Sequence, residues 1–291
     1  MDAPPSTLIR DLAVTIKARL PARSNDSWLV SRGAEDLVLR RHHDQLGLGH
    51  ELLGLSVAWQ VSASEVAVAG GWPAPHPCGQ PIEHLGSWWT LEQFLPGEPR
   101  TTTATERAEL ITTWHATPFP IDRLGPRPGA LDHLAILTDP YAETVLGGCE
   151  GRADREWLLR RLDQARELAE GIDWTASRRV LVHGDLIDQN LLWTGDRLTG
   201  LLDLELANVN RRATELLLTW RCRHDAIVYE LHRLDPLSEH EWRMLLVDWW
   251  ALLLTLAAVG LRKCRQPDRW ELDGLRRETT LSRALTCGRR P

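Results

Sequence analysis

Apolar and polar residues alternate over short stretches in the first third of the chain, a pattern typical of strands separated by turns. Four segments in this part are predicted strands: 27–30, 36–40, 65–69 and 87–95. Two other segments carry apolar residues at every third or fourth position and are predicted helices, at 6–20 and 50–59. Pro96-Gly97 then interrupts the pattern and marks the end of this part of the chain.

After residue 99 the apolar residues adopt the spacing of helices. Five helices are predicted: 102–115, 152–170, about 214–232, 239–263 and 270–285. Two short apolar strands lie among them, at 180–182 and 198–202. Because strands cluster before residue 96 and helices follow it, we expect an α+β fold with two lobes, residues 1–95 and 96–291, rather than an alternating parallel sheet.

Composition and charge narrow the class of protein. Hydrophobic residues make up 43% and charged residues 25% of the 291 residues, which is ordinary for a soluble globular protein. The formal net charge of −6 argues against a nucleic-acid partner, which usually requires a basic surface. The five cysteines form no Cys-x-x-Cys pair, so neither a disulfide framework nor a zinc site is expected. The N-terminus lacks an apolar signal core, and the longest apolar run, 249–261, is too short for a bilayer. These features predict a cytoplasmic protein, a monomer by default, with no membrane partner.

The segment from His183 to Asp203 carries the strongest chemical signal. His183-Gly184-Asp185 follows a predicted strand, Asn190 comes after four further residues, and Asp203 ends the next predicted strand. This spacing matches a phosphoryl-transfer site, in which an Asp orients the attacking hydroxyl while an Asn and a second Asp hold magnesium. A lone His-Gly-Asp would be no more than a turn, but the whole combination is rare.

From His183 to Asp203 the sequence also closely resembles the signature of the aminoglycoside phosphotransferase and choline kinase superfamily. The resemblance implies a two-lobed, protein-kinase-like fold and an enzyme that uses ATP and Mg²⁺ to phosphorylate a hydroxyl group. It also implies that Asp185 is the catalytic base, that Asn190 and Asp203 are magnesium ligands, and that His183 supports the loop.

The resemblance extends to the predicted nucleotide-binding lobe, residues 1–95. Residues 37–40 resemble the family's third strand, which places Arg40 at the basic residue for the nucleotide phosphates. Glu51 falls where the family has a helix acid that pairs with this residue. Residues 92–97 resemble the hinge, so Gln93, Phe94 and Leu95 would hold the adenine. The chain departs from the family in having Arg rather than the more usual Lys at position 40, and in lacking a glycine-rich loop before the second strand.

Charge distribution favours a cationic small-molecule substrate. Residues 183–250 hold 12 Asp and Glu against seven Arg, an excess of five negative charges. An acidic cleft would attract a cation such as an aminoglycoside or a basic peptide antibiotic. The candidate substrate contacts are Asp188, Glu205, Asp225 and Glu230, with Glu239 and Glu241 as further candidates.

Three functions stay open at this point. The first is an antibiotic O-phosphotransferase, and the second is a metabolic kinase for a sugar, an amino alcohol or homoserine. The third is a nucleotide-binding pseudokinase, which the intact Asp185, Asn190 and Asp203 disfavour. A protein kinase is also disfavoured, because the Asp-Phe-Gly and Ala-Pro-Glu motifs are absent.

Overall fold

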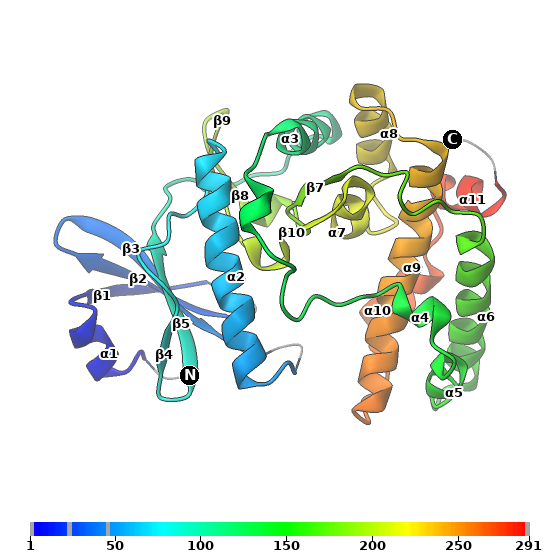
Figure 1. Cartoon of the computed structure of the whole chain (residues 1–291), viewed down its shortest axis with the longest axis horizontal. Helices are drawn as coiled ribbons and strands as arrows, with labels where there is room; N and C mark the ends of the chain where they lie inside the picture. The colour runs from blue at the N-terminus through cyan, green and yellow to red at the C-terminus, as the bar shows by residue number, and fades with distance from the viewer. Residues whose placement is uncertain (1–2, 22–24, 45–46, 289–291) are drawn as a thin grey trace. The chain divides into compact units, whose positions relative to one another are not determined.

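The computed structural model describes residues 3–21, 25–44 and 47–288, and its chain forms two compact units (Figure 1). The first unit consists of Met1–Thr101, Thr117–Ala130 and Ile187–Val209. The second consists of Thr102–Ala116, Leu131–Leu186 and Asn210–Pro291. The first unit therefore contains two segments that lie beyond residue 96. The lobe boundary between residues 95 and 96 stays a prediction.

A five-stranded antiparallel sheet forms the centre of the first unit. Its strands, in spatial order, are β1 Thr15–Leu20, β2 Asp26–Arg32, β3 Glu35–His42, β5 Ser87–Gln93 and β4 Ile82–His84. One face is apolar and packs with Leu8 of α1 (Ser6–Asp11) into a core that includes Trp28, Leu39 and Trp89. Because side chains alternate between faces, Arg40 and its neighbours His42 and Glu92 lie on the opposite face.

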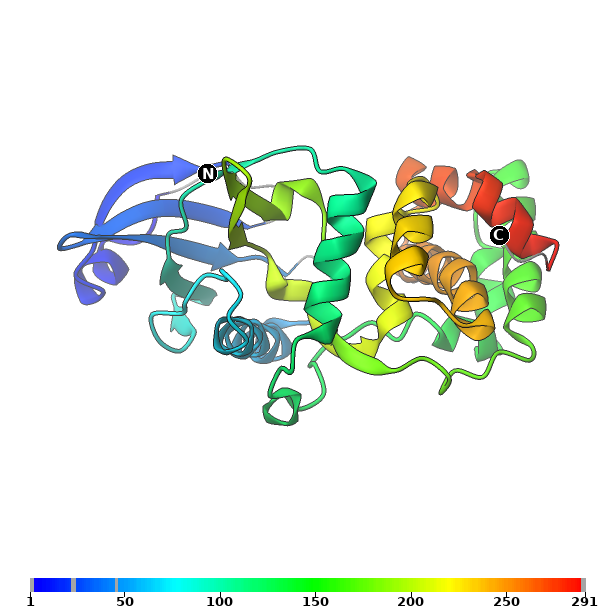
Figure 2. The same cartoon turned by 90° about the horizontal axis from the view of Figure 1, so that it is seen from above.

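The long helix α2 (His50–Ala69) lies along this sheet in Figure 1 and is seen nearly end-on in Figure 2. The predicted strand at 65–69 is wrong, because α2 continues through it. The sequence offers no helix breaker before Gly70-Gly71. The predicted helix at 6–20 is also wrong beyond residue 11. Ala13 has a positive φ of 53°, which ends α1, and the β-branched residues that follow enter β1.

A second, three-stranded sheet completes the first unit, in the order β6 (Glu98–Pro99), β8 (Leu191–Thr194), β9 (Arg197–Leu201). Short 3₁₀ helices flank it: η1 Ile121–Arg123, η2 Asp188–Asn190 and η3 Leu204–Leu206. The sequence analysis missed β8, which joins β9 in a tight hairpin. Gly195 adopts a left-handed φ of 60° in that turn.

The second unit is mostly helical, which agrees with the predicted α+β class. Its elements are α3 Ala104–Ala116, α4 Ala135–Thr138, α5 Ala142–Leu146, α6 Arg152–Ala169, β7 Arg179–Val182, η4 Arg212–Glu215, α7 Leu216–Trp220, α8 Asp225–Leu234, α9 Glu239–Arg262, α10 Arg269–Arg276 and α11 Thr280–Thr286. Strand β7 pairs with β10 (Asn208–Arg211), whose residues 210–211 belong to this unit. Helix α9 contacts α5, α6 and α10 and is largely buried.

The helix predicted at 239–263 is confirmed as α9, and the apolar run at 249–261 lies within it and is mostly buried. By length and composition, both α2 and α9 could cross a membrane, a test that buried core helices also pass. The predicted helix at 214–232 is broken, because Arg221 and Cys222 both have left-handed φ angles, of 52° and 48°.

Candidate active site

The first part of the predicted catalytic loop, residues 183–186, lies in the second unit, directly after β7. His183 is fully buried, and its ring packs edge-on against Trp114 with the ring centroids 6.2 Å apart. The Asp185 amide donates a hydrogen bond to His183 Nδ1 over 3.3 Å. Gly184 between them has φ of 83°, a backbone conformation that a residue with a side chain rarely adopts. These contacts hold the loop in one shape and suit the supporting role expected for His183.

Glu215, at the end of η4, binds the backbone of the same loop. Its carboxylate is fully buried and accepts hydrogen bonds from the amides of His183 (2.7 Å) and Gly184 (3.0 Å). His115 Nε2 lies 3.6 Å from the same carboxylate. Burial by itself raises the pKa of Glu215, but His115 and the His183 amide outweigh that effect and lower it. The sequence analysis missed Glu215, which carries no recognisable motif.

Arg221 holds the carboxylate of Asp185. Its Nη2 donates to Asp185 Oδ1 over 3.0 Å, and its Nε donates to the carbonyl of Leu218 over 2.6 Å. The left-handed backbone of Arg221 ends α7, and Arg277 donates to the Arg221 carbonyl over 3.1 Å. Arg221 was missed because the sequence places it inside a continuous predicted helix.

In the first unit, Arg40 forms a buried ion pair with Glu92 rather than with Glu51. Arg40 Nη2 donates to Glu92 Oε1 over 3.0 Å. Thr90 is the cross-strand partner of Arg40, so Glu92 lies diagonally opposite on the same sheet face and within reach. Glu51 is exposed in the first turn of α2, whereas Gln60, about 14 Å further along the helix axis, is one of the α2 residues that line a pocket with Arg40.

The Arg40–Glu92 pair shifts both ionisation equilibria. The charge of Glu92 raises the pKa of Arg40 despite burial. Burial raises the pKa of Glu92, and Arg40 opposes this only in part. Arg40 therefore stays protonated, and the carboxylate of Glu92 balances its positive charge.

The predicted magnesium ligands flank β8 and β9. The Leu202 amide donates to the Asn190 carbonyl over 2.8 Å. Because Leu202 directly precedes Asp203, this hydrogen bond keeps the backbone of Asn190 near that of Asp203. Asp203 has a left-handed φ of 64°, and its Oδ1 is buried without a hydrogen-bond partner among the described residues. This Oδ1 lies 3.8 Å from Arg40 Nη1.

Glu205 lies two residues beyond Asp203 and completes this oxygen-rich site. Burial, followed by repulsion from Asp203, raises the pKa of Glu205 to about 7. No cluster of three or more His, Cys, Asp or Glu side chains is found in the described part of the chain. An unbonded carboxylate oxygen, an amide and a nearby second carboxylate fit Mg²⁺, which prefers oxygen and takes its remaining ligands from phosphate and water.

The hinge offers one backbone donor. The amide of Gln93 donates to the His76 carbonyl (2.9 Å), and that of Phe94 donates to the Asp36 carbonyl (3.2 Å). The Leu95 amide has no acceptor among the described residues. Of the three residues predicted to contact the nucleotide base, Leu95 is therefore the one whose N–H can donate to it.

Most of the acids proposed as substrate contacts have structural partners instead. Asp225 accepts from Trp220 Nε1 (2.8 Å) and from the Leu281 amide (3.0 Å). Glu230 pairs with Arg233, and Glu239 pairs with Arg243. Asp188 is half-buried at the start of η2. The acidic excess of this region is thus largely satisfied within the protein.

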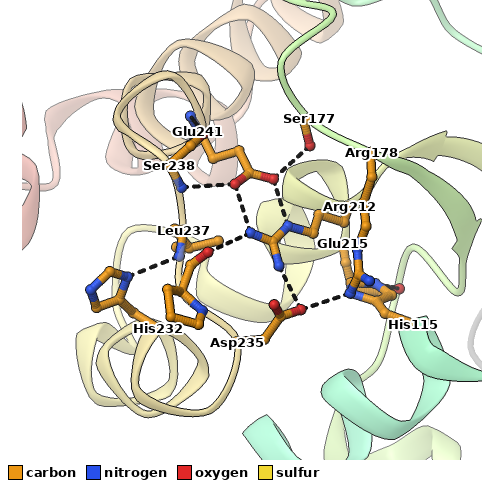
Figure 3. A network of polar contacts seen from close by, with 11 residues as sticks. His115, Ser177, Arg178, Arg212, Glu215, His232, Asp235, Leu237, Ser238 and Glu241 are labelled. Carbon is orange, nitrogen blue, oxygen red and sulfur yellow. Dashed lines mark hydrogen bonds and ion pairs between the residues drawn. The ribbon is translucent and has the colours of Figure 1, made fainter.

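Glu241 belongs to the polar network drawn in Figure 3, which also includes Arg212 and Asp235. Its carboxylate accepts two hydrogen bonds from Arg212, of 2.6 and 2.7 Å, and one from Ser177. Arg212 also pairs with Asp235. Burial alone would raise the pKa of Glu241, but these hydrogen bonds and that of the Ser238 amide lower it to about 2. The network ties η4, which carries Glu215, to α9.

Known proteins match the chain in family and in fold. The model of the phosphotransferase enzyme family matches residues 15–235. The fold is similar to that of aminoglycoside 2'-phosphotransferase-IIIa in its GDP complex (TM-score 0.67, 16% identity, 97% of this chain and 95% of that one). A thermostable mutant of aminoglycoside phosphotransferase APH(4)-Ia with ADP and hygromycin B gives a TM-score of 0.64 at 15% identity, over 97% of both chains. A microcompartment-associated aminopropanol kinase gives 0.61 at 15% identity, over 97% of this chain and 94% of that one.

Among curated protein sequences, none matches. The family match covers residues 15–235, well over half of the 291 residues, and the catalytic-loop spacing lies inside it. The chain therefore belongs to the phosphotransferase enzyme family, as a kinase for hydroxyl groups with the α+β fold of the aminoglycoside phosphotransferases.

Proposed function

We propose that this protein transfers the γ-phosphate of ATP to a hydroxyl group of a small molecule that carries an amine. The observation that carries the proposal is the fixed carboxylate of Asp185. Arg221 holds one oxygen of Asp185, and the loop on which it lies is anchored through two amides to the buried Glu215. A carboxylate held in this way is suited to orient an alcohol and to accept its proton.

Each conserved role of the reaction has a candidate residue in this chain. Asp185 receives the proton of the attacking hydroxyl, and Arg221 keeps the carboxylate in its orientation. Asn190 and Asp203 would hold Mg²⁺, which supplies charge neutralisation for the phosphates. The Leu95 amide would donate to the base of the nucleotide. The oligomeric state and the cytoplasmic location stay predictions.

The amine on the acceptor is inferred from similar proteins and from charge. Proteins with this fold include kinases for aminoglycosides and for aminopropanol, which are all alcohols with amino groups. The net charge of −6 favours the approach of a cation. The aminopropanol kinase supports a second candidate, a kinase for a small metabolic amino alcohol instead of an antibiotic.

A coupled ADP-release assay with Mg-ATP tests the proposal against aminoglycosides, basic peptide antibiotics, small amino alcohols and sugars. Stimulation by one amine-bearing class, lost in Asp185→Ala, is the expected result. Stimulation by amine-free sugars alone would contradict the acceptor class. ATP binding without stimulation by any acceptor would instead favour a pseudokinase.

A further inference from the structure

A pocket of about 130 Å³ in the first unit has unsatisfied polar groups on its walls. It lies between the end of β3, the middle of α2 and the segment 117–130. Its polar lining includes Asn25, Gln60, Arg127 and Glu205. Gln60 also lines the adjacent small pocket that contains Arg40, Glu92 and Asp203, so the two spaces share a wall.

Arg127 is a partly buried cation on the wall of this pocket. Within the described residues its guanidinium makes no hydrogen bond or ion pair, and its Nε is fully buried. Burial lowers the pKa of Arg127, and Glu205 offsets this only in part. An uncompensated buried charge is costly, so the position is explained if a ligand supplies the missing anion.

Gln60 is a second, independent sign of a ligand. Only 9% of its surface is exposed, and its amide has no hydrogen-bond partner among the residues that the structure describes. The amide atoms are not among the fully buried ones, so they are accessible to a ligand in the pocket that Gln60 lines. Two donor-bearing side chains, one on α2 and one on the segment 117–130, thus face the same pocket without acceptors.

The chemistry of these donors fits a phosphate group. A guanidinium binds phosphate through two parallel hydrogen bonds, and an amide N–H adds a third. Arg40, the basic residue expected at the phosphates, is already neutralised by Glu92. A second cation beside the phosphates would add to the neutralisation that Arg40 and Mg²⁺ provide.

The position of the pocket along β3 indicates which phosphate of the nucleotide it would bind. Leu37 lies opposite Gln93 at the hinge, Arg40 lies opposite Thr90, and His42 lies at the far end of β3. The pocket begins at His42 and is therefore farther from the hinge than Arg40. A nucleotide with its base at the hinge and its phosphates beside Arg40 would therefore extend toward this pocket.

We propose that Arg127 and Gln60 bind the terminal phosphate of the nucleoside triphosphate in this pocket. The inference rests on the proposed function, because it takes ATP as the nucleotide. It assigns the role of second phosphate-binding cation to the segment 117–130, which carries no recognised motif.

The other charged groups around the pocket are compatible with this assignment. Asp44 is occupied by the amides of Leu48 and Gly49. His43 pairs with Asp26, and His42 has its pKa lowered to about 3, chiefly by burial, so it is neutral. Glu205 lies two residues from the predicted magnesium ligand Asp203, so Mg²⁺ held there would offset its repulsion of a phosphate.

Calorimetric titration of the full chain with the magnesium complexes of a non-hydrolysable ATP analogue and ADP, and with adenosine, tests the proposal. Arg127→Met should weaken binding of the triphosphate about tenfold or more, as expected for a lost charged hydrogen bond. The affinities of the Arg127→Met variant for ADP and adenosine should stay within about twofold of those of the wild type. Gln60→Leu should show a smaller loss with the same selectivity. Arg123→Met removes an exposed cation from the same segment and is the matched control.

Arg127→Lys, which retains the charge, replaces Arg127→Met if thermal unfolding shows that the methionine variant is not folded. It should give an intermediate loss of triphosphate affinity. An unchanged preference for triphosphate over diphosphate in the Arg127 variant would overturn the inference. A wild-type protein that binds these nucleotides but phosphorylates no acceptor would contradict the proposed function alone, whereas failure to bind any nucleotide would overturn both.

Discussion

At the residue scale, the proposed reaction depends on how firmly the carboxylate of Asp185 is held. Asp185 can be recognised from the sequence, but its orientation depends on Arg221, which is 36 residues away. Arg221 does not contact the acceptor in this account, so it is a positioning residue. Its left-handed backbone and its bonds to Leu218 and Arg277 restrict the guanidinium to one direction.

Arg221→Met should lower kcat about ten- to a hundredfold, because Asp185 then samples orientations that cannot accept the proton. The KM values for nucleotide and acceptor should change little. Steady-state kinetics on purified protein measures both. Arg221→Lys should restore part of kcat, and the exposed Arg223→Met should behave as wild type. A rise in KM with kcat unchanged would assign Arg221 to substrate binding instead.

Which site residues the sequence reveals depends on how local their signal is. Asp185, Asn190 and Asp203 lie in one short segment with characteristic spacing, so they could be predicted. Glu215, Arg221 and the partner choice of Arg40 depend on contacts between elements far apart in the chain. No spacing rule marks such residues.

At the element scale, strongly periodic segments were predictable and their breaks were not. Strands β2 and β3 and helices α6 and α9 appear close to the expected places. The errors at 65–69 and 214–232 have different causes. The Ala- and Val-rich stretch at 65–69 suits a helix or a strand, and its packing decides between them. Arg221 ends a helix through hydrogen bonds to distant residues rather than through a helix-breaking residue.

The pairing of Arg212 with Glu241 also acts at this scale, because it joins η4 to α9 (Figure 3). The pKa of Glu241 is lowered from 4.5 to about 2 in the folded state. A carboxyl group with a depressed pKa stabilises the fold above its unfolded pKa and loses that effect as pH falls toward its folded pKa. The contribution of Glu241 should therefore be complete above about pH 4.5 and disappear toward pH 2.

Glu241→Gln should lower the free energy of unfolding at pH 7 by about 2–4 kcal/mol, since it leaves buried Arg212 with one fewer charge partner. The gap to wild type should narrow between pH 4.5 and pH 2 in urea titrations. Glu239→Gln, in an exposed pair on the same helix, should cost less than about 0.5 kcal/mol. A gap independent of pH would show that packing, and not the charge of Glu241, is what matters.

At the scale of the whole molecule, the net charge of −6 gives little information on the substrate. Several acids between residues 183 and 250 serve Arg side chains or helix ends, as Glu230, Glu241 and Asp225 show. The family and the fold follow from the whole chain, whereas the acceptor depends on a few side chains. The proposed function must therefore be tested by identifying the product of the reaction.

The most direct test is to identify the phosphorylated product. Wild-type protein is incubated with Mg-ATP and the acceptor that most stimulates ADP release, and phosphorus NMR with mass spectrometry follows the acceptor. We predict one phosphate monoester on a hydroxyl of an amine-bearing acceptor, and a loss of at least about a hundredfold in its rate of formation in Asp185→Asn. A product formed equally fast by that variant, or ADP release with the acceptor unmodified, would contradict the proposed phosphotransfer.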